Sequence, residues 1–180
     1  ADSDQIPIPD LESLIICPWD ETCAWMFADL WWKNKPYNLC PRSALKRIVQ
    51  NVSEEGYGVF AGIEPEFIVM KWQDGQPLKA FDNDPKYDEG LRPRRQAFGY
   101  DVEFTLDSMG FLGELIDIIE KLGWNLHDVV AEGAYSQFEI DFHYTDILSM
   151  ADRLVFLRVL LKEVAKHHGK FVTFMPKPTI

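Results

Sequence analysis

The sequence predicts an α+β fold, with a mainly antiparallel sheet and helices packed on one face of it. Three observations lead to this prediction. Residues 137–144 alternate between polar and apolar side chains, which is the pattern of a strand with one buried face. Residues 145–168 carry apolar side chains at helical spacing. Hairpin-type turn sequences such as residues 73–77 occur, and there is no regular β-α-β alternation.

The first 42 residues are expected to be the end of a β-rich region followed by a linker. Residues 1–12 are polar and contain prolines, which indicates an irregular lead-in. Residues 13–17 and 23–32 are apolar and predict two strands, and the turn sequence at residues 18–21 makes them an antiparallel hairpin.

Residues 43–180 are expected to form the second part of the fold. It begins with a helix over residues 44–52, which Gly56 and Gly58 follow as breakers, and a long strand over residues 59–72. The apolar face of the helix consists of Leu45, Ile48, Val49 and Val52.

A long surface excursion is expected at residues 73–103, which carry proline, glycine and charge without a clear period. Its basic cluster at residues 92–95 has two interpretations, a solvated loop or a contact with an anion. The remaining expected elements are a helix over 108–122, strands over 126–131 and 137–144, a helix over 145–168 and a strand over 171–174. Gly123 and Gly169 are the expected helix stops.

The composition excludes several classes of function. The net charge of −11 argues against nucleic acid and anionic membranes as partners. No apolar stretch approaches the ~20 residues of a membrane span, and no signal peptide is visible. The first residue is not Met, which indicates processing or trimming. Cys17, Cys23 and Cys40 match no zinc-binding spacing and are expected to be free thiols, so we expect a cytoplasmic protein.

Two acidic segments form a candidate metal site. In residues 62–67, Glu64 and Glu66 lie two positions apart in an expected strand, so their side chains point the same way, with their stems ~7 Å apart. Glu132 ends the next expected strand and Glu139 lies in the one after it, so a hairpin can bring both to one face. Carboxylates this close repel each other, and a divalent cation removes the repulsion.

Four carboxylates suit a hard cation such as Mg²⁺ or Mn²⁺, and they predict phosphoryl transfer or metal-assisted activation. A second interpretation is that the carboxylates face solvent on a one-sided antiparallel sheet. The pattern alone leaves both interpretations open. His143 and Lys177 also have two interpretations each: His143 supports the metal site or is an ordinary polar residue, and Lys177 contacts a phosphate or belongs to a rigid turn between prolines.

Several motifs resemble those of the glutamine synthetase family, in the family's order and over nearly the whole chain. Residues 62–67 are similar to its G-x-E-x-E-F strand, and residues 132–139 to its E-x-x-x-G-Q-x-E segment. Residues 173–178 are similar to its T-F-M-P-K-P turn. Other matching landmarks are Ile8-Pro9-Asp10, Pro18-Trp19, Cys40-Pro41-Arg42, Ala151-Asp152-Arg153 and residues 164–170.

The resemblance implies ATP-dependent amide formation, in which glutamate becomes γ-glutamyl phosphate and ammonia displaces the phosphate. By match, Glu66, Glu132 and Glu139 hold a Mg²⁺ or Mn²⁺ ion near the glutamate, and Glu64 serves a second cation that bridges the ATP phosphates. Among weaker matches, Gln137 lies beside the last ligand, Tyr144 lies near the position that faces adenine, and Lys177 is a nucleotide or substrate contact.

The chain also departs from the family pattern. Ser136 stands where the family has glycine, and the chain stops at Ile180, before the family's histidine ligand and its arginines. We therefore expect an incomplete glutamine synthetase-like catalytic domain that is inactive alone. The alternative is a non-catalytic, metal-binding or structural homologue. Residues 98–102 and 137–142 are more similar to the γ-glutamyl-amine ligase branch. The resemblance further implies a homo-oligomer.

Overall fold

A computed structural model describes residues 4–81 and 99–178. The chain divides into two compact units, the first made of residues 1–61 and 144–153, the second of residues 62–143 and 154–180. Every strand pairing among the described residues is antiparallel, and helices accompany the sheets, so the predicted α+β class is confirmed. The basic cluster at residues 92–95 lies outside the described residues.

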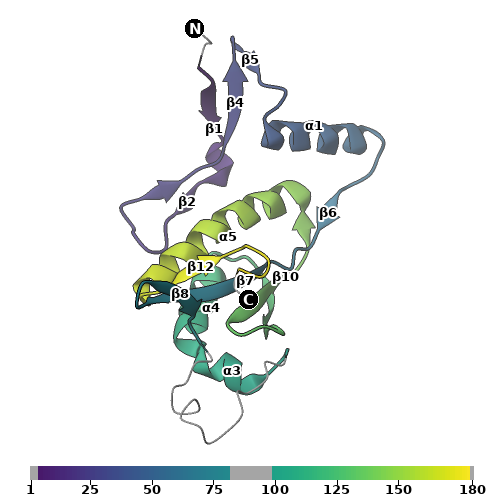
Figure 1. Cartoon of the computed structure of the whole chain (residues 1–180). Helices are drawn as coiled ribbons and strands as arrows, with labels where there is room; N and C mark the ends of the chain where they lie inside the picture. The colour runs from purple at the N-terminus through teal and green to yellow at the C-terminus, as the bar shows by residue number, and fades with distance from the viewer. Residues whose placement is uncertain (1–3, 82–98, 179–180) are drawn as a thin grey trace, which may run out of the picture. The chain divides into compact units, whose positions relative to one another are not determined.

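The first unit contains three small sheets (Figure 1). They are β1 (Ile6–Pro9), β4 (Ala28–Trp32) and β5 (Lys35–Pro36); β2 (Ile15–Ile16) with β3 (Ala24–Trp25); and β6 (Phe60–Ala61) with β11 (Thr145–Asp146). The β2–β3 pair confirms the predicted hairpin, although its strands are shorter than expected.

The expected irregular lead-in and the expected single strand over residues 23–32 are both wrong. β1 pairs with β4, and a 3-10 turn at Leu11–Ser13 follows it. The prolines are tolerated because β1 is an edge strand, where a missing N–H need not break a ladder. β3 and β4 join different sheets, and Met26 and Phe27 lie between them. The Phe27 N–H donates to Ser13 Oγ at 2.9 Å, and the Phe27 carbonyl accepts from Asp10 N at 2.8 Å.

Helix α1 (Pro41–Glu54) confirms the helix predicted over residues 44–52 and extends it at both ends. Pro41 lies in the first turn, where its missing N–H has no partner within the helix to lose. The expected apolar face is not buried, however. Ile48 is 58% exposed, and Ser43 is the one buried residue of the helix.

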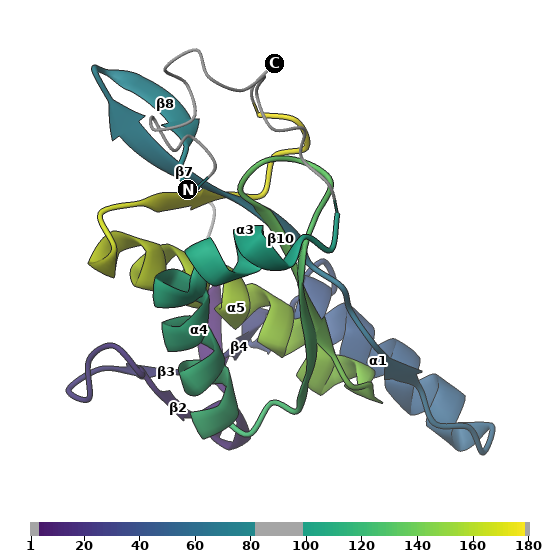
Figure 2. The ribbon, with the colours of Figure 1, turned by 90° about the horizontal axis from the view of Figure 1, so that it is seen from below.

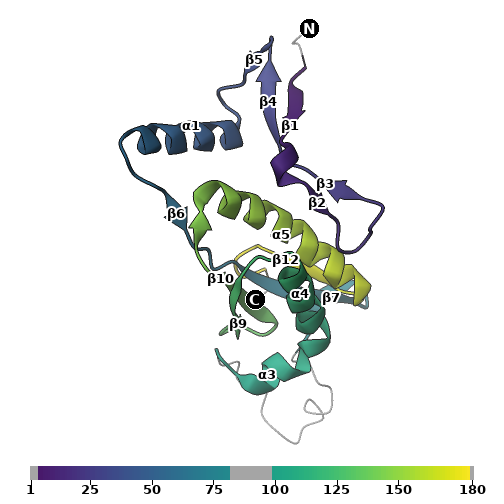
Figure 3. The ribbon, with the colours of Figure 1, turned by 180° about the vertical axis from the view of Figure 1, so that it is seen from behind.

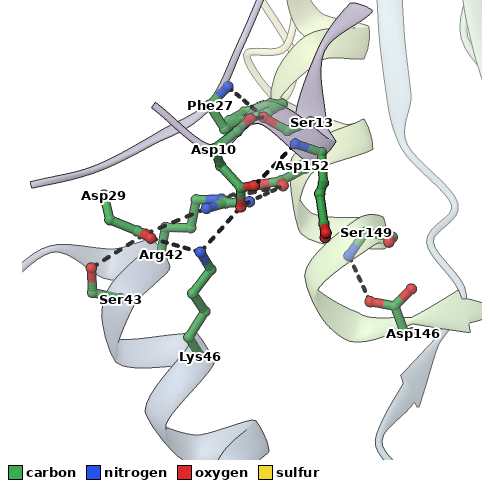
Figure 4. A network of polar contacts seen from close by, with 11 residues as sticks. Asp10, Ser13, Phe27, Asp29, Arg42, Ser43, Lys46, Asp146, Ser149 and Asp152 are labelled. Atoms are coloured by element: carbon green, nitrogen blue, oxygen red, sulfur yellow. Dashed lines mark hydrogen bonds and ion pairs between the residues drawn. The ribbon is translucent and has the colours of Figure 1, made fainter. Parts of the chain in front are cut away.

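A cluster of ion pairs holds the first unit together (Figure 4). The Arg42 guanidinium donates to both carboxylate oxygens of Asp152, through Nε at 3.0 Å and Nη2 at 2.9 Å. It also donates to Asp10 at 2.8 Å, and Lys46 donates to Asp10 and Asp29 at 3.1 and 2.6 Å. Hydrogen bonds from Arg42 and then Lys46 hold the pKa of Asp10 below its usual value of 3.8. The cluster therefore connects the β1 end, β4, α1 and the start of α5 (Ile147–His167).

The second unit is built on a five-stranded sheet with the order β12-β7-β10-β9, in which β8 also pairs with β7. The strands are β7 (Glu66–Gln73), β8 (Gln76–Lys79), β9 (Leu126–Ala131), β10 (Gln137–Phe142) and β12 (Phe171–Thr173). Figure 2 shows β7 and β8 as a hairpin. Its turn residues Asp74 and Gly75 have φ of 52° and 74°, which suits a two-residue hairpin turn and confirms the predicted one.

The long strand predicted over residues 59–72 is wrong, because it is divided into β6 and β7. Pro65 has no N–H to donate, so the ladder is interrupted just before Glu66. The backbone still runs along β10 before that point. The carbonyls of Ile63 and Pro65 accept from Phe142 N at 3.4 Å and from Ile140 N at 3.3 Å.

Helices α4 (Met109–Lys121) and α5 confirm the two long helices predicted from apolar spacing. Gly123 and Gly169 follow them with φ of 67° and 64°, as expected for helix stops. The structureless excursion predicted over residues 73–103 is wrong in part, since it contains β8 and the start of α3 (Val102–Asp107). No helix in the described ranges is long and apolar enough to cross a membrane.

The helices pack on one face of the second unit's sheet (Figure 3), as predicted. The Phe67 ring on β7 lies 6.4 Å from the Phe111 ring on α4. Trp124, which follows α4, contacts Phe142 on β10 and Phe156 on α5 at centroid distances of 6.1 and 5.6 Å. These side chains are buried. The polar side chains of the same strands are consequently left on the opposite face.

Candidate metal centre

Strand β10 separates the core from the candidate site. Phe138, Ile140 and Phe142 are buried, while Glu139 and Asp141 are half-buried on the other side. The alternation predicted from the sequence is therefore present, but the strand ends at Phe142, two residues earlier than expected.

The pairing of β10 with β7 brings two of the predicted ligands together. Glu139 lies directly opposite Glu66, and Gln137 lies opposite Ile68. Directly opposite residues of an antiparallel pair have Cβ atoms about 4.5–5.5 Å apart. Gln137 Nε2 donates to Glu66 Oε2 at 2.5 Å, so the amide fixes the orientation of that carboxylate.

Glu132 reaches the same place from the end of β9. Its backbone N–H donates to Gln137 O at 2.9 Å, which continues the β9–β10 ladder by one step. Its carboxyl group is near enough to Glu139 to raise the pKa of that residue. Its Oε2 also accepts weakly from Gly133 N at 3.3 Å. Glu66 on β7 and Glu132 just after β9 thus come from the two segments that flank β10 near Glu139.

The electrostatics of Glu139 reflect this crowding. Burial, followed by the neighbouring Glu132 carboxyl group and the charges of Asp141 and Glu66, together raise its pKa from 4.5 to about 7. A raised pKa means that burial and neighbouring negative charges disfavour the ionised form of the carboxyl group. The site therefore favours a positively charged ligand.

Glu64, the fourth predicted ligand, precedes β7 and lies between the two residues whose carbonyls accept from β10. Continuing the register of Glu66 with Glu139 by two residues places Glu64 opposite Asp141. Burial raises the pKa of Asp141, and the charges of Glu64 and Asp128 add to this effect. The four predicted carboxylates therefore share one face of the sheet with Asp141.

The donor set fits a hard divalent cation, because it consists of carboxylate oxygens and a supporting amide. The oxygens do not converge on one point: within residues 4–81 and 99–178, no three Asp, Glu, His or Cys side chains are gathered closely enough to hold an ion. Like charges repel, and Glu66 and Glu132 turn toward the neutral donors Gln137 and Gly133 instead. The metal site stays a prediction.

Ser136, which departs from the family pattern, adopts the conformation that a glycine would adopt there. Its φ is 59°. The serine is buried, and its Oγ donates to Phe81 O at 2.7 Å and accepts from Phe81 N at 2.8 Å. Its carbonyl accepts from Val69 N at 2.9 Å. The side chain thus ties the turn between Glu132 and Glu139 to the chain that follows β8.

The other residues singled out in the sequence are exposed. His143 is exposed just after β10, with its ring 4.5 Å from the ring of His127. Tyr144, expected on the apolar side of the strand, is instead 74% exposed, contacts Phe60 edge-on and belongs to the first unit. Lys177 is exposed, with φ of 50° between its two prolines.

Sequence reasoning gave too little weight to Asp141, and it did not place Asp128 beside it. Asp141 is two residues after Glu139, and Asp128 lies opposite Asp141 on β9. The strict alternation of β10 carried the signal for Asp141. No comparable pattern marked Asp128, because its place depends on the register between β9 and β10.

Comparisons with known proteins agree with the resemblance. Residues 38–180 match the family model described as "Glutamine synthetase, catalytic domain". A glutamine synthetase of Rhizobium leguminosarum bv. phaseoli is 36% identical over 99% of this chain and 38% of its own length. A gamma-glutamylanilide synthase of Acinetobacter sp is 32% identical over 97% of this chain and 36% of its own length. The chain thus spans little more than a third of these relatives.

Solved structures show the same relationship in three dimensions. The apo form of GmaS without ligand superposes with a TM-score of 0.87 at 32% identity, covering 99% of this chain and 40% of that one. A glutamine synthase homologue superposes with a TM-score of 0.72 at 22% identity, covering 96% of this chain and 37% of that one, and supports the fold.

Proposed function

This chain belongs to the glutamine synthetase family, and on that premise we propose that it is part of an ATP-dependent ligase joining glutamate to ammonia or to an amine. The proposed reaction forms γ-glutamyl phosphate and then the amide. The observation that carries the proposal is the position of Glu66 directly opposite Glu139, inside the part of the chain that matches the family model.

In this proposal Glu66, Glu132 and Glu139 hold one Mg²⁺ or Mn²⁺ ion, and Glu64 serves a second. When bound, such cations neutralise the charge on the transferring phosphoryl group and on ATP. Gln137 supports the site by holding the Glu66 carboxylate through its amide. Tyr144 and Lys177 are proposed nucleotide or substrate contacts by family match, a role that rests on the resemblance.

The nucleophile is proposed to be an amine rather than ammonia. This is supported by the likeness to gamma-glutamylanilide synthase, whose name specifies an anilide product. A likeness of similar size to glutamine synthetases supports the alternative. The full-length enzyme, assayed for ATP-dependent turnover with methylamine and with ammonia at equal concentration, should prefer methylamine. A clear preference for ammonia would contradict the amine assignment.

Three further features belong to the same proposal. We propose a cytoplasmic homo-oligomer, supported by three cysteines without disulfides and by the family match. The boundary between a β-rich region over residues 1–42 and a catalytic part over residues 43–180 is proposed on the sequence pattern. The chain alone is expected to lack ligase turnover, since it spans 38% of the length of the Rhizobium relative.

The deciding experiment is a calorimetric titration of the chain with Mn²⁺. The wild type should bind Mn²⁺, and Glu66→Gln combined with Glu139→Gln should abolish binding because both central carboxylates are removed. Glu120→Gln, at an exposed position on α4, is the matched control and should bind like the wild type. A wild type that does not bind Mn²⁺, or a double variant that binds unchanged, would contradict the metal site. Ligase turnover by the isolated chain would contradict the expected inactivity.

Binding without turnover in a full-length protein would favour the second candidate, a non-catalytic homologue that keeps the metal site. The same Mn²⁺ titration on the full-length protein, followed by an assay for ATP-dependent γ-glutamyl transfer, separates the two candidates.

A further inference from the structure

Asp141 is the one carboxylate on the site face with a buried oxygen that has no partner. Its Oδ1 is buried and accepts no hydrogen bond from any described residue. None of the ion pairs among the described residues includes Asp141. A buried acceptor without a donor costs free energy, and a charged one costs more. Such a group calls for a compensating ligand.

The neighbours of Asp141 supply mostly additional negative charge. Glu64 faces it from the extended stretch before β7, Asp128 lies directly opposite on β9, and Glu132 is close enough to act on its charge. His127 is the neighbour whose charge acts in the opposite direction. A hydrogen-bonding protein group therefore does not explain the burial of Oδ1.

We infer that Asp141 is a further carboxylate of the cation site at Glu64, supplying negative charge and an oxygen toward the second divalent cation. The inference rests on the proposed function, because it takes from it the two cations and the role of Glu64. It adds a residue from β10 that lies across the ladder from Glu64, in the same relation as Glu139 to Glu66. The Glu66–Glu139 pair then contributes to the site of one cation, and the Glu64–Asp141 pair, two residues further along both segments, contributes to the site of the other.

Asp128 provides a matched control. It is the same residue type, lies opposite Asp141 on the other neighbouring strand and is exposed, and its Oδ1 accepts from Val129 N at 2.7 Å. Removing its charge should weaken cation binding only through the general loss of one negative charge. The difference between Asp141→Asn and Asp128→Asn isolates the contribution of Asp141, because both substitutions preserve side-chain shape.

The test is a Mn²⁺ titration followed by electron paramagnetic resonance of the free ion, which gives the number of sites and their affinities without any assay of activity. The wild type should bind two ions. Asp141→Asn and Glu64→Gln should each weaken the same one by about 10- to 100-fold, and the double variant should be little worse than either single variant. Asp128→Asn should stay close to the wild type.

Each outcome separates the inference from the proposed function. If Asp141→Asn behaves like Asp128→Asn while Glu64→Gln and Glu139→Gln weaken binding, the role of Asp141 is overturned and the metal site stands. If the wild type binds no Mn²⁺, both are overturned. Thermal unfolding without metal checks that each variant is folded. Should Asp141→Asn fail to fold, the smaller Asp141→Ser gives the same measurement, and its unchanged affinity would overturn the inference.

Discussion

At Ser136 the backbone has a positive φ of 59°, which glycine adopts freely and serine rarely does. The side chain compensates through its two hydrogen bonds with the Phe81 backbone. Ser136→Ala keeps the strain and loses both bonds, so we expect it to lower the free energy of unfolding by about 1–3 kcal/mol. Ser136→Gly also loses the bonds but releases the strain, and should fall between alanine and wild type. Urea unfolding followed by circular dichroism measures all three; an unchanged midpoint for Ser136→Ala would show that these bonds contribute nothing.

The carboxylate of Asp10 makes the first unit sensitive to acid. Its pKa is lowered from 3.8 in the folded chain by hydrogen bonds from Arg42 and Lys46. When pH falls, the unfolded chain takes up this proton first, so the contribution to stability is complete above about pH 3.8 and is lost as pH falls through the lower, folded pKa. Asp10→Asn should be less stable than wild type at pH 6, and the difference should shrink toward pH 2. Thermal melts across this range test it; a constant difference would contradict the linkage.

Among the elements, helix α4 offers the clearest measure of core packing. Leu115 is fully buried, whereas Leu106 on α3 is 64% exposed. Leu115→Ala should lower the free energy of unfolding by about 2–5 kcal/mol, because it removes buried methyl groups and leaves a cavity. Leu106→Ala makes the same chemical change where no cavity forms, and should stay within about 0.5 kcal/mol of wild type. Chemical unfolding of both variants would contradict this packing if their losses were equal.

Elements whose apolar side chains repeat regularly could be predicted from the sequence. Strands that form only by pairing with another segment of the chain could not. α4 and α5 were predicted because their apolar spacing is regular. β1 contains two prolines and exists as a strand only because β4 pairs with it. β8 likewise depends on β7. At the candidate site, alternation predicted which face Glu139 occupies, but not that Glu66 lies opposite it, since a register between distant segments is set by tertiary packing.

For the molecule as a whole, the net charge of −11 predicts a dependence of stability on ionic strength. Salt screens repulsion between exposed charges, with a Debye length of about 10 Å at 0.1 M. The unfolding temperature should therefore rise between about 20 mM and about 200 mM NaCl. MgCl₂ at the same ionic strength should raise it further, since the carboxylate face gains a specific ligand, and Glu66→Gln with Glu139→Gln should remove only that extra rise. Differential scanning calorimetry would contradict the specific effect if the two salts acted alike on the wild type.

The Arg42–Asp152 pair also sets an order of events during synthesis of the protein. Its partners are separated by 110 residues, whereas Asp10 and Asp29 are already present when Arg42 emerges. At roughly 5–20 residues per second, the ribosome needs on the order of 10 s to supply Asp152. During that interval the guanidinium can be held by the two earlier aspartates alone. The first unit is thus completed only after most of the second unit's chain has been made, so a nascent chain that pauses between the two events carries a partly assembled charge cluster.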